Sequence, residues 1–221
     1  MKNRGKIGLF KNYISSPGNI PDIPLPPEAP SRAYLKIEEV WLWCDHWLPR
    51  AMLAGDTVLE VGSAPGGTAY SMLQRGLKVV GVDPCPLDRQ HAPVVKDNEN
   101  FIEIKSYLEK LDRKNMPVGV NWLLCDANIP IVDALPYLQS ISTIYGPSFK
   151  GVFLTCKLND KILGKPELAV DYLDKLKNKV KSSMGLSVAS YKYLNANRQE
   201  VLLCGLSKNT ANLLNSYSSL K

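Results

Sequence analysis

A glycine-rich turn between two apolar runs places the strongest constraint on the fold of this chain. Residues 57–68 read Thr-Val-Leu-Glu-Val-Gly-Ser-Ala-Pro-Gly-Gly-Thr, and residues 78–83 read Lys-Val-Val-Gly-Val-Asp. Short valine- and leucine-rich runs are typical of parallel strands that are covered on both faces. Glycine allows a sharp turn and lets a ligand approach the backbone, and we expect a helix to begin near Gly66. The pattern therefore predicts two parallel strands with a ligand-binding turn after the first.

The acid that ends the second run indicates the class of ligand. Asp83 follows Gly62 by about 20 residues, where a carboxylate can accept both hydroxyls of an adenosine ribose. A dinucleotide site would place a second glycine against the pyrophosphate, but Ala64 and Pro65 stand there. This favours S-adenosylmethionine, which carries no phosphate, over NAD; an α/β protein whose turn binds nothing is the alternative. The predicted cofactor-binding residues are Gly62, Ala64, Pro65, Gly66, Gly67, Asp83 and Asp126.

Strand-like and helix-like segments alternate along the rest of the chain. We expect an amphipathic helix that is capped by Ser31 and broken before the first strand by Gly55 and Asp56. Further helices are expected at 132–144 and 167–183, and further strands at 101–104, 121–125, 151–156, 186–191 and 200–206. This alternation predicts a doubly wound α/β sheet whose ligands bind at the carboxyl ends of the strands.

The chain of 221 residues suits one domain with a sizeable core. Residues 1–30 are basic at the start and proline-rich at the end, which predicts an extended arm before a domain at 31–206 and a tail at 207–221. No apolar segment spans a membrane and the N-terminus lacks the core of a secretory signal, so we expect a soluble, cytoplasmic protein without a membrane partner.

The cysteines and the net charge narrow the class of protein further. Five widely spaced cysteines with two histidines indicate neither a disulfide framework nor a metal site, and Cys125, Cys156 and Cys204 are expected to pack in the core. The formal net charge of +6 is compatible with a nucleic acid partner and slightly favours one.

Four charged residues stand near predicted strand ends. Lys36 lies on the first helix, Asp126 and Lys157 follow the fourth and fifth strands, and Glu200 opens the last. If the last strand is antiparallel, these residues meet at one rim, although any one of them could equally be a solvated edge residue. Such a cluster suits methyl transfer to a ribose hydroxyl, which needs a base or a strong acceptor for its proton. Lys157 is the best candidate for the base, provided that desolvation or a nearby cation lowers its pKa.

These motifs together resemble a known family. The segments at 31–39, 60–67, 125–126, 155–157 and 200–201 occur in the order found in FtsJ/RrmJ-type ribose 2′-O-methyltransferases, and 32–39 with 156–158 are most similar to the RlmM-type branch, which acts on a cytidine of 23S ribosomal RNA. The resemblance implies a Rossmann-like S-adenosylmethionine-dependent methyltransferase fold with seven mostly parallel strands and an antiparallel last strand. It also implies an RNA substrate, ribosomal RNA in particular, and a catalytic tetrad of Lys36, Asp126, Lys157 and Glu200.

Some features depart from that family or leave alternatives open. The third strand is not followed by an acid for the adenine, which leaves Asp97 and Glu99 as substitutes. RNA capture is expected to use the basic arm and the lysines at 175, 177, 179 and 181, although such a run is as often a solvated helix face. Arg32 and Tyr34 could touch RNA or pack the first helix, whereas the tryptophans at 41, 43 and 47 are expected in the core or an interface.

Two other functions fit the same sequence. One is methyl transfer to a small molecule or a protein, and the other is a noncatalytic RNA-binding or assembly protein that retains the fold. A partner protein that supplies specificity is also compatible with the sequence.

Overall fold

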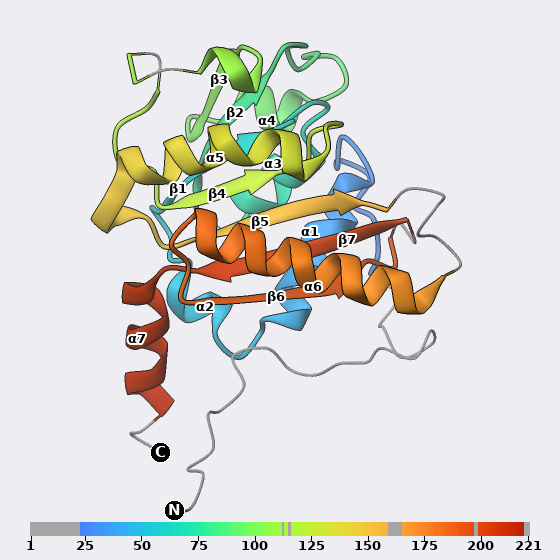
Figure 1. The fold of residues 1–221 in the computed structure, drawn as a ribbon. Helices are drawn as coiled ribbons and strands as arrows, with labels where there is room; N and C mark the ends of the chain where they lie inside the picture. The colour runs from blue at the N-terminus through green and yellow to red at the C-terminus, as the bar shows by residue number, and fades with distance from the viewer. Residues whose placement is uncertain (1–22, 112, 115, 159–164, 197–198, 219–221) are drawn as a thin grey trace, which may run out of the picture.

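The computed structural model describes residues 23–111, 113–114, 116–158, 165–196 and 199–218. Its centre is one seven-stranded sheet with the order β3-β2-β1-β4-β5-β7-β6 (Figure 1). The strands are β1 (Thr57–Val61), β2 (Lys78–Asp83), β3 (Phe101–Lys105), β4 (Trp122–Cys125), β5 (Gly151–Lys157), β6 (Val188–Tyr193) and β7 (Glu200–Leu206). β7 pairs antiparallel with both neighbours, while β1 to β5 pair in parallel. The predicted doubly wound sheet with an antiparallel last strand is confirmed.

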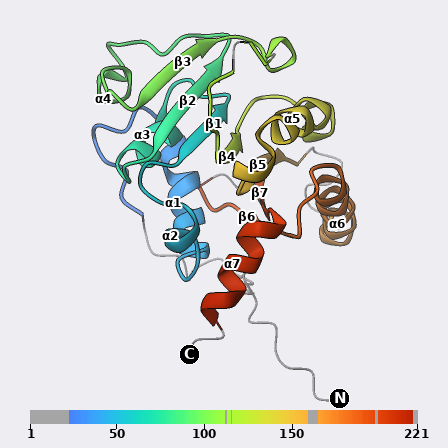
Figure 2. The ribbon, with the colours of Figure 1, turned by 90° about the vertical axis from the view of Figure 1, so that its left-hand side faces the viewer.

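Helices cover both faces of this sheet, as Figure 2 shows edge-on. The α-helices are α1 (Ala33–Trp43), α2 (Leu48–Ala51), α3 (Gly67–Leu73), α4 (Pro93–Lys96), α5 (Ile131–Tyr145), α6 (Pro166–Ser183) and α7 (Lys208–Ser218). Two single turns of 3₁₀-helix are η1 (Leu108–Lys110) and η2 (Gly146–Ser148). The helices α1 to α4 lie on one face, and α5 and α6 lie on the other (Figures 1 and 2).

Each face of the sheet has its own apolar core. On the α1 and α3 side, Trp122 stacks on Phe153 with ring centroids 5.6 Å apart, and Trp47 is buried in the same cluster. On the other side, Leu123 and Leu154 pack with residues of α5 and α6. Neighbouring residues of a strand point to opposite faces, so a central strand covered on both faces is apolar at nearly every position. Cys125, Cys156 and Cys204 are buried, as predicted.

The antiparallel pairing of β7 decides where the charged residues meet. Lys157, the last residue of β5, lies opposite Glu200, the first residue of β7. The start of β7 therefore shares a rim with the ends of β1, β4 and β5, as expected from the sequence. In Figure 1 the arrows of β5 and β7 point in opposite directions.

Two predicted elements differ from the structure. The single helix expected between Ser31 and Gly55 is wrong: α1 ends at Trp43 and a separate short helix, α2, begins at Leu48. Pro49 lies in the first turn of α2, where its missing N–H costs nothing, whereas inside a longer helix it would break a hydrogen bond. The predicted cap at Ser31 is also displaced, because Arg32 is the N-cap residue and the Ser31 hydroxyl accepts from Ala33 N at 3.3 Å.

The strand expected at 186–191 runs from Val188 to Tyr193 instead. The chain first closes the end of α6, where Gly185 adopts a φ of +63° and Leu186 N donates to Lys181 O at 2.9 Å. This left-handed glycine ending of a helix uses the residues that the sequence pattern assigned to the strand.

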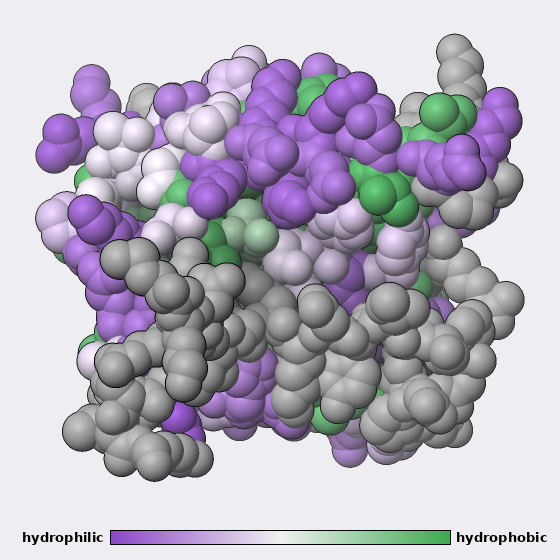
Figure 3. Space-filling view, turned by 60° about the horizontal axis from the view of Figure 1, so that its bottom comes forward, coloured by the Kyte–Doolittle hydropathy of each residue, from purple (hydrophilic) through white to green (hydrophobic). Residues whose placement is uncertain are grey.

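The predicted arm and tail flank the sheet domain in the sequence. The predicted arm at 1–30 falls mostly outside the described residues, and the predicted tail contains α7, whose Ala211 and Leu214 are buried. The domain boundaries stay a prediction. None of the described helices is long and apolar enough to cross a membrane. In Figure 3 the described part of one face is largely hydrophilic, with apolar side chains in separate patches.

Candidate active site

The turn after β1 passes against the turn after β4 at Gly62. This glycine has a φ of +82°, and its N–H donates to Val82 O at 2.9 Å. A Cβ added there would lie 2.6 Å from the backbone nitrogen of Ala127. Only glycine meets both requirements, so the two strand ends approach each other with backbone against backbone.

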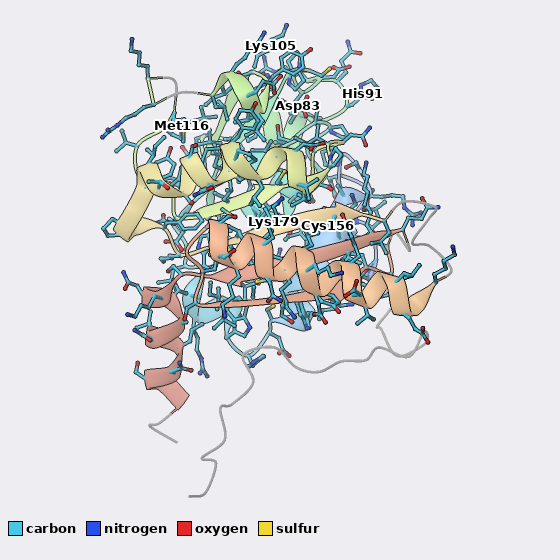
Figure 4. All side chains as sticks on the ribbon, viewed as in Figure 1. Asp83, His91, Lys105, Met116, Cys156 and Lys179 are labelled. Atoms are coloured by element: carbon cyan, nitrogen blue, oxygen red, sulfur yellow. The ribbon has the colours of Figure 1, made fainter. Side chains whose placement is uncertain are left out.

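Asp83 reaches across to this glycine turn from the end of β2. Its Oδ2 accepts from Ala64 N at 3.1 Å, and its Oδ1 accepts from Cys85 N at 2.8 Å. Each carboxylate oxygen can accept more than one hydrogen bond, so Asp83 retains the capacity to accept from hydroxyl groups. Figure 4 shows the position of Asp83 relative to Cys156, the residue before Lys157 on β5.

The rest of the turn leads into α3. Pro65 follows a cis peptide bond, and Gly66 has a φ of +102° as the residue before the helix. The predicted helix start near Gly66 is confirmed, because α3 begins at Gly67. A Cβ on Gly67 would lie 2.4 Å from the hydroxyl of Ser31, so this glycine allows α3 to pack closely on the start of α1. Its predicted contact with a cofactor stays a prediction.

A buried acid in β1 is a site residue that the sequence reasoning missed. Glu60 is fully buried, and its Oε2 has no hydrogen-bond partner among the described residues. Burial, with the nearby charges of Asp126 and Asp83, raises the pKa of this carboxyl well above its ordinary value. A glutamate inside an otherwise apolar central strand was the available signal, because an unpaired buried charge is costly.

Lys36 on α1 contacts acidic side chains from two other parts of the chain. Its Nζ lies 2.9 Å from Asp126 Oδ2 and 3.0 Å from Oδ1, and 2.8 Å from Glu200 Oε2. The three side chains come from α1, the turn after β4 and the start of β7, and each is at most 18% exposed. Of the four residues predicted to meet at the rim, these three are in direct contact.

The charges in this cluster control one another. Burial alone would lower the pKa of Lys36, but Asp126 and Glu200 outweigh it and the pKa is raised. Burial is also the largest influence on Asp126 and raises the pKa of its carboxyl, although Lys36 and a hydrogen bond from Thr155 act in the opposite direction. Lys36 is therefore held as an ammonium ion, which suits it to charge stabilisation and not to proton abstraction.

Lys157 stands apart from this contact. It lies opposite Glu200 in the strand pairing, but its side chain is exposed and its Nζ donates to Asn128 Oδ1 at 2.8 Å. Asn128, in the turn after β4, was not singled out from the sequence. The expected desolvation of Lys157 is absent from the chain itself, so a bound substrate would have to exclude water from its amine.

The other candidates are distributed around the molecule. Asp97 forms an ion pair with Arg89, and Glu99 is exposed, so neither is singled out as an adenine contact. Tyr34 lies beside Tyr70 with ring centroids 5.8 Å apart, while the Arg32 side chain is exposed.

The aromatic and lysine-rich stretches divide between the core and the surface. Trp43 and Trp47 are buried in the core, and Trp41 lies under the guanidinium of Arg75. On α6, Lys175 and Lys177 form ion pairs with Asp171 and Asp174, which reduces the positive charge that this helix offers to a polyanion.

Comparison with known protein sequences identifies one family that matches most of the chain. The sequence pattern of the FtsJ-like methyltransferase family matches residues 29–183. A relative named ribosomal RNA large subunit methyltransferase M, from Pseudomonas syringae pv. syringae, is 42% identical over 81 residues, which are 34% of this chain and 22% of the relative. A relative of the same name from Cellvibrio japonicus is 38% identical over 125 residues, which are 54% of this chain and 33% of the relative. The chain thus matches about a fifth to a third of the length of these relatives.

Solved structures with the same fold bind S-adenosylmethionine. Magnesium protoporphyrin IX methyltransferase from Synechocystis PCC 6803, solved with bound SAM, aligns with a TM-score of 0.56 and 14% identity, over 80% of each chain. Aeropyrum pernix fibrillarin, solved with S-adenosyl-L-methionine, aligns with a TM-score of 0.52 and 18% identity, over 70% of this chain and 68% of that one. At such low identity these alignments show the fold alone, which is the Rossmann-like methyltransferase fold.

Proposed function

The chain belongs to the FtsJ-like methyltransferase family, and from this premise we propose that it transfers the methyl group of S-adenosylmethionine to a ribose 2′-hydroxyl of RNA. The observation that carries the proposal is the Lys36 ammonium held between Asp126 and Glu200, with Lys157 opposite Glu200 on the neighbouring strand. A methyltransferase for a more acidic small molecule would need no such arrangement of two lysines and two acids.

The residues around the glycine turn fit the cofactor. Asp83 would accept the hydroxyls of its ribose, and the backbone at Gly62 and Gly66 would lie against it. Asp126 supplies negative charge beside this turn, which suits a ligand that carries a sulfonium and an ammonium group. When bound, S-adenosylmethionine supplies an electrophilic methyl group.

Each of the four charged residues has its own role in the proposed transfer. The 2′-hydroxyl oxygen would take the methyl group as the bond from its carbon to sulfur breaks, and the hydroxyl proton would pass to Nζ of Lys157 once bound substrate excludes water from it. Lys36 offsets negative charge that develops on the attacking oxygen. Asp126 and Glu200 hold the Lys36 ammonium in place, and Asn128 holds the amine of Lys157 before substrate binds.

We extend the proposal to ribosomal RNA as the substrate, in the cytoplasm. Its support is the name of the relatives, ribosomal RNA large subunit methyltransferase M, over the shared segment. The basic chain suits a polyanionic substrate, and the affinity should fall as salt is raised because phosphate contacts release counterions.

Labelled-methyl transfer tests this function. Wild type, Lys157→Ala and Lys36→Ala are incubated with labelled S-adenosylmethionine and total RNA, and binding of the cofactor is measured in the same samples. We expect transfer to RNA by wild type and a loss of about 100-fold or more in both variants, with cofactor binding retained. Lys78→Ala is the matched control, because Lys78 is an exposed lysine at the start of β2, at the end of the strand away from the site. Cofactor binding without transfer to any RNA would contradict the proposal and favour a noncatalytic protein or one that acts on another substrate.

A further inference from the structure

Glu39 is a buried acid that the proposed transfer does not use. It lies on α1 one turn after Lys36 and is only 3% exposed. Residues three apart on a helix share a face, so Lys36 and Glu39 project from the same side of α1. Lys36 meets the start of β7, and Glu39 meets the turn that leads into that strand.

The Glu39 carboxylate holds this turn with a set of hydrogen bonds. Its Oε1 accepts from Asn195 N at 3.0 Å and from Ala196 N at 2.6 Å. Its Oε2 accepts from Asn195 N and Asn195 Nδ2, each at 2.9 Å, and lies 3.3 Å from Lys192 Nζ on β6. Both carboxylate oxygens are thus directed at one short segment between β6 and β7.

Glu200 stands close to the anchored segment. Three residues separate Ala196 from Glu200, and Leu194 N donates to Glu200 O at 3.0 Å. A shift of the turn would therefore move the start of β7 relative to α1. Because Glu200 is the acid that contacts Lys36 from this side, the same shift would change the contact between Lys36 and Glu200.

A buried ion pair adds little to the free energy of unfolding, since apolar residues of similar size in its place often give a protein that is equally stable. What a carboxylate adds is geometry, because it binds two adjacent backbone N–H groups and an amide at fixed positions. We infer that Glu39 is a positioning residue, which fixes Asn195 and Ala196 after β6 so that Glu200 meets Lys36 at the reacting centre. This role rests on the proposed function.

The test compares Glu39→Gln with Glu38→Gln. Glu38 is the adjacent acid on α1, and its carboxylate also accepts several hydrogen bonds. The donors are Arg75, at 2.8 Å, and Ser71, at 2.6 Å, which lie just after α3 and on α3. Both changes remove one charge from a partly or fully buried ion pair of α1. Only the change at Glu39 touches the turn before Glu200.

We expect Glu39→Gln to lower kcat about 10- to 100-fold, since a shift of about 1 Å at a reacting centre has this effect. Its dissociation constant for S-adenosylmethionine should stay within about twofold, and Glu38→Gln should keep kcat within about threefold. In a Glu200→Gln background, Glu39→Gln should add less than about threefold, because residues that act through one another are not additive. A loss of equal size in both backgrounds, or no loss in kcat, would overturn the inference.

Two further measurements keep the test decisive. If Glu39→Gln does not fold, Asn195→Ala replaces it, because Asn195 is exposed and its Nδ2 donates to the same carboxylate; the same non-additivity with Glu200→Gln is expected. Amide hydrogen exchange is also measured over 195–206, and Glu39→Gln or Asn195→Ala should exchange faster there while Glu38→Gln matches wild type.

The exchange measurement separates the two claims. If wild type transfers no methyl group to RNA but the exchange result holds, the proposed function fails while Glu39 is still shown to hold the turn. If wild type is active and exchange over 195–206 is unchanged in the Glu39 and Asn195 variants, the positioning role is wrong.

Discussion

Replacing Glu60 with glutamine should make the protein more stable, and the gain should grow as the pH rises. Glu60 is fully buried and its Oε2 has no partner among the described residues, so its charged form is disfavoured. The pKa of the folded protein's carboxyl is raised, chiefly by burial and then by Asp126 and Asp83. The glutamine has nearly the same shape and carries no charge at any pH.

The sign and the slope follow from proton linkage. An acid with a raised folded-state pKa contributes stability below its unfolded pKa of 4.5, and this contribution is lost as the pH rises through the folded-state pKa. Between those two values the folded protein holds one proton more than the unfolded chain. The free energy of unfolding of wild type therefore falls by ~1.4 kcal/mol per pH unit relative to Glu60→Gln.

Urea unfolding at pH 5, 6 and 7 measures this difference. Asp126, whose pKa is also raised, is present in both proteins, so most of its contribution cancels in the comparison. Glu103→Gln is the control with the opposite sign: burial favours a higher pKa there, but Lys96 and the Leu87 amide outweigh it and the pKa is lowered. Its difference from wild type should be flat over this range. A Glu60→Gln difference that does not change with pH would show that the pKa of Glu60 is not raised in the folded protein.

Three further results are expected. The dissociation constant for S-adenosylmethionine should rise as the pH falls from 8 to 5 in titration calorimetry, because the pKa of Asp126 is raised and its carboxylate takes up a proton, which removes attraction for a cation. A constant dissociation constant over this range would count against this expectation. Gly62→Ala should weaken cofactor binding by about tenfold or more, whereas Gly119→Ala, with a similar φ of +77° but open space around it, should bind normally; equal affinities in the two variants would contradict the backbone contact. Phe153→Ala should lower the free energy of unfolding by about 3–5 kcal/mol in urea, and a loss below about 1 kcal/mol would contradict its place in the core.

The fold could be predicted from sequence because its strongest signals are local. Valine-rich runs, the turn at Gly62 and the acid at Asp83 lie within 27 residues of one another, and each follows from backbone sterics or burial. The break between α1 and α2 was also signalled locally, by Pro49, but the amphipathic pattern on both sides of it suggested one helix.

The details of the site depended on contacts between distant parts of the chain. Glu39 binds a turn 156 residues further on, and such a pairing leaves no local pattern. The convergence of Lys36, Asp126 and Glu200 could be expected only on the condition that the last strand is antiparallel. The exposure of Lys157 and its bond to Asn128 depend on how two turns pack, which strand periodicity does not determine.

The position of the new methyl group distinguishes transfer to the ribose from transfer to a base. RNA methylated by wild type with labelled S-adenosylmethionine is hydrolysed in alkali, which cleaves every linkage that keeps a free 2′-hydroxyl. We expect the label to remain in alkali-resistant dinucleotides, and this fraction should disappear in Lys157→Ala. Label released in mononucleotides would place the methyl group on a base, and it would contradict transfer to the ribose.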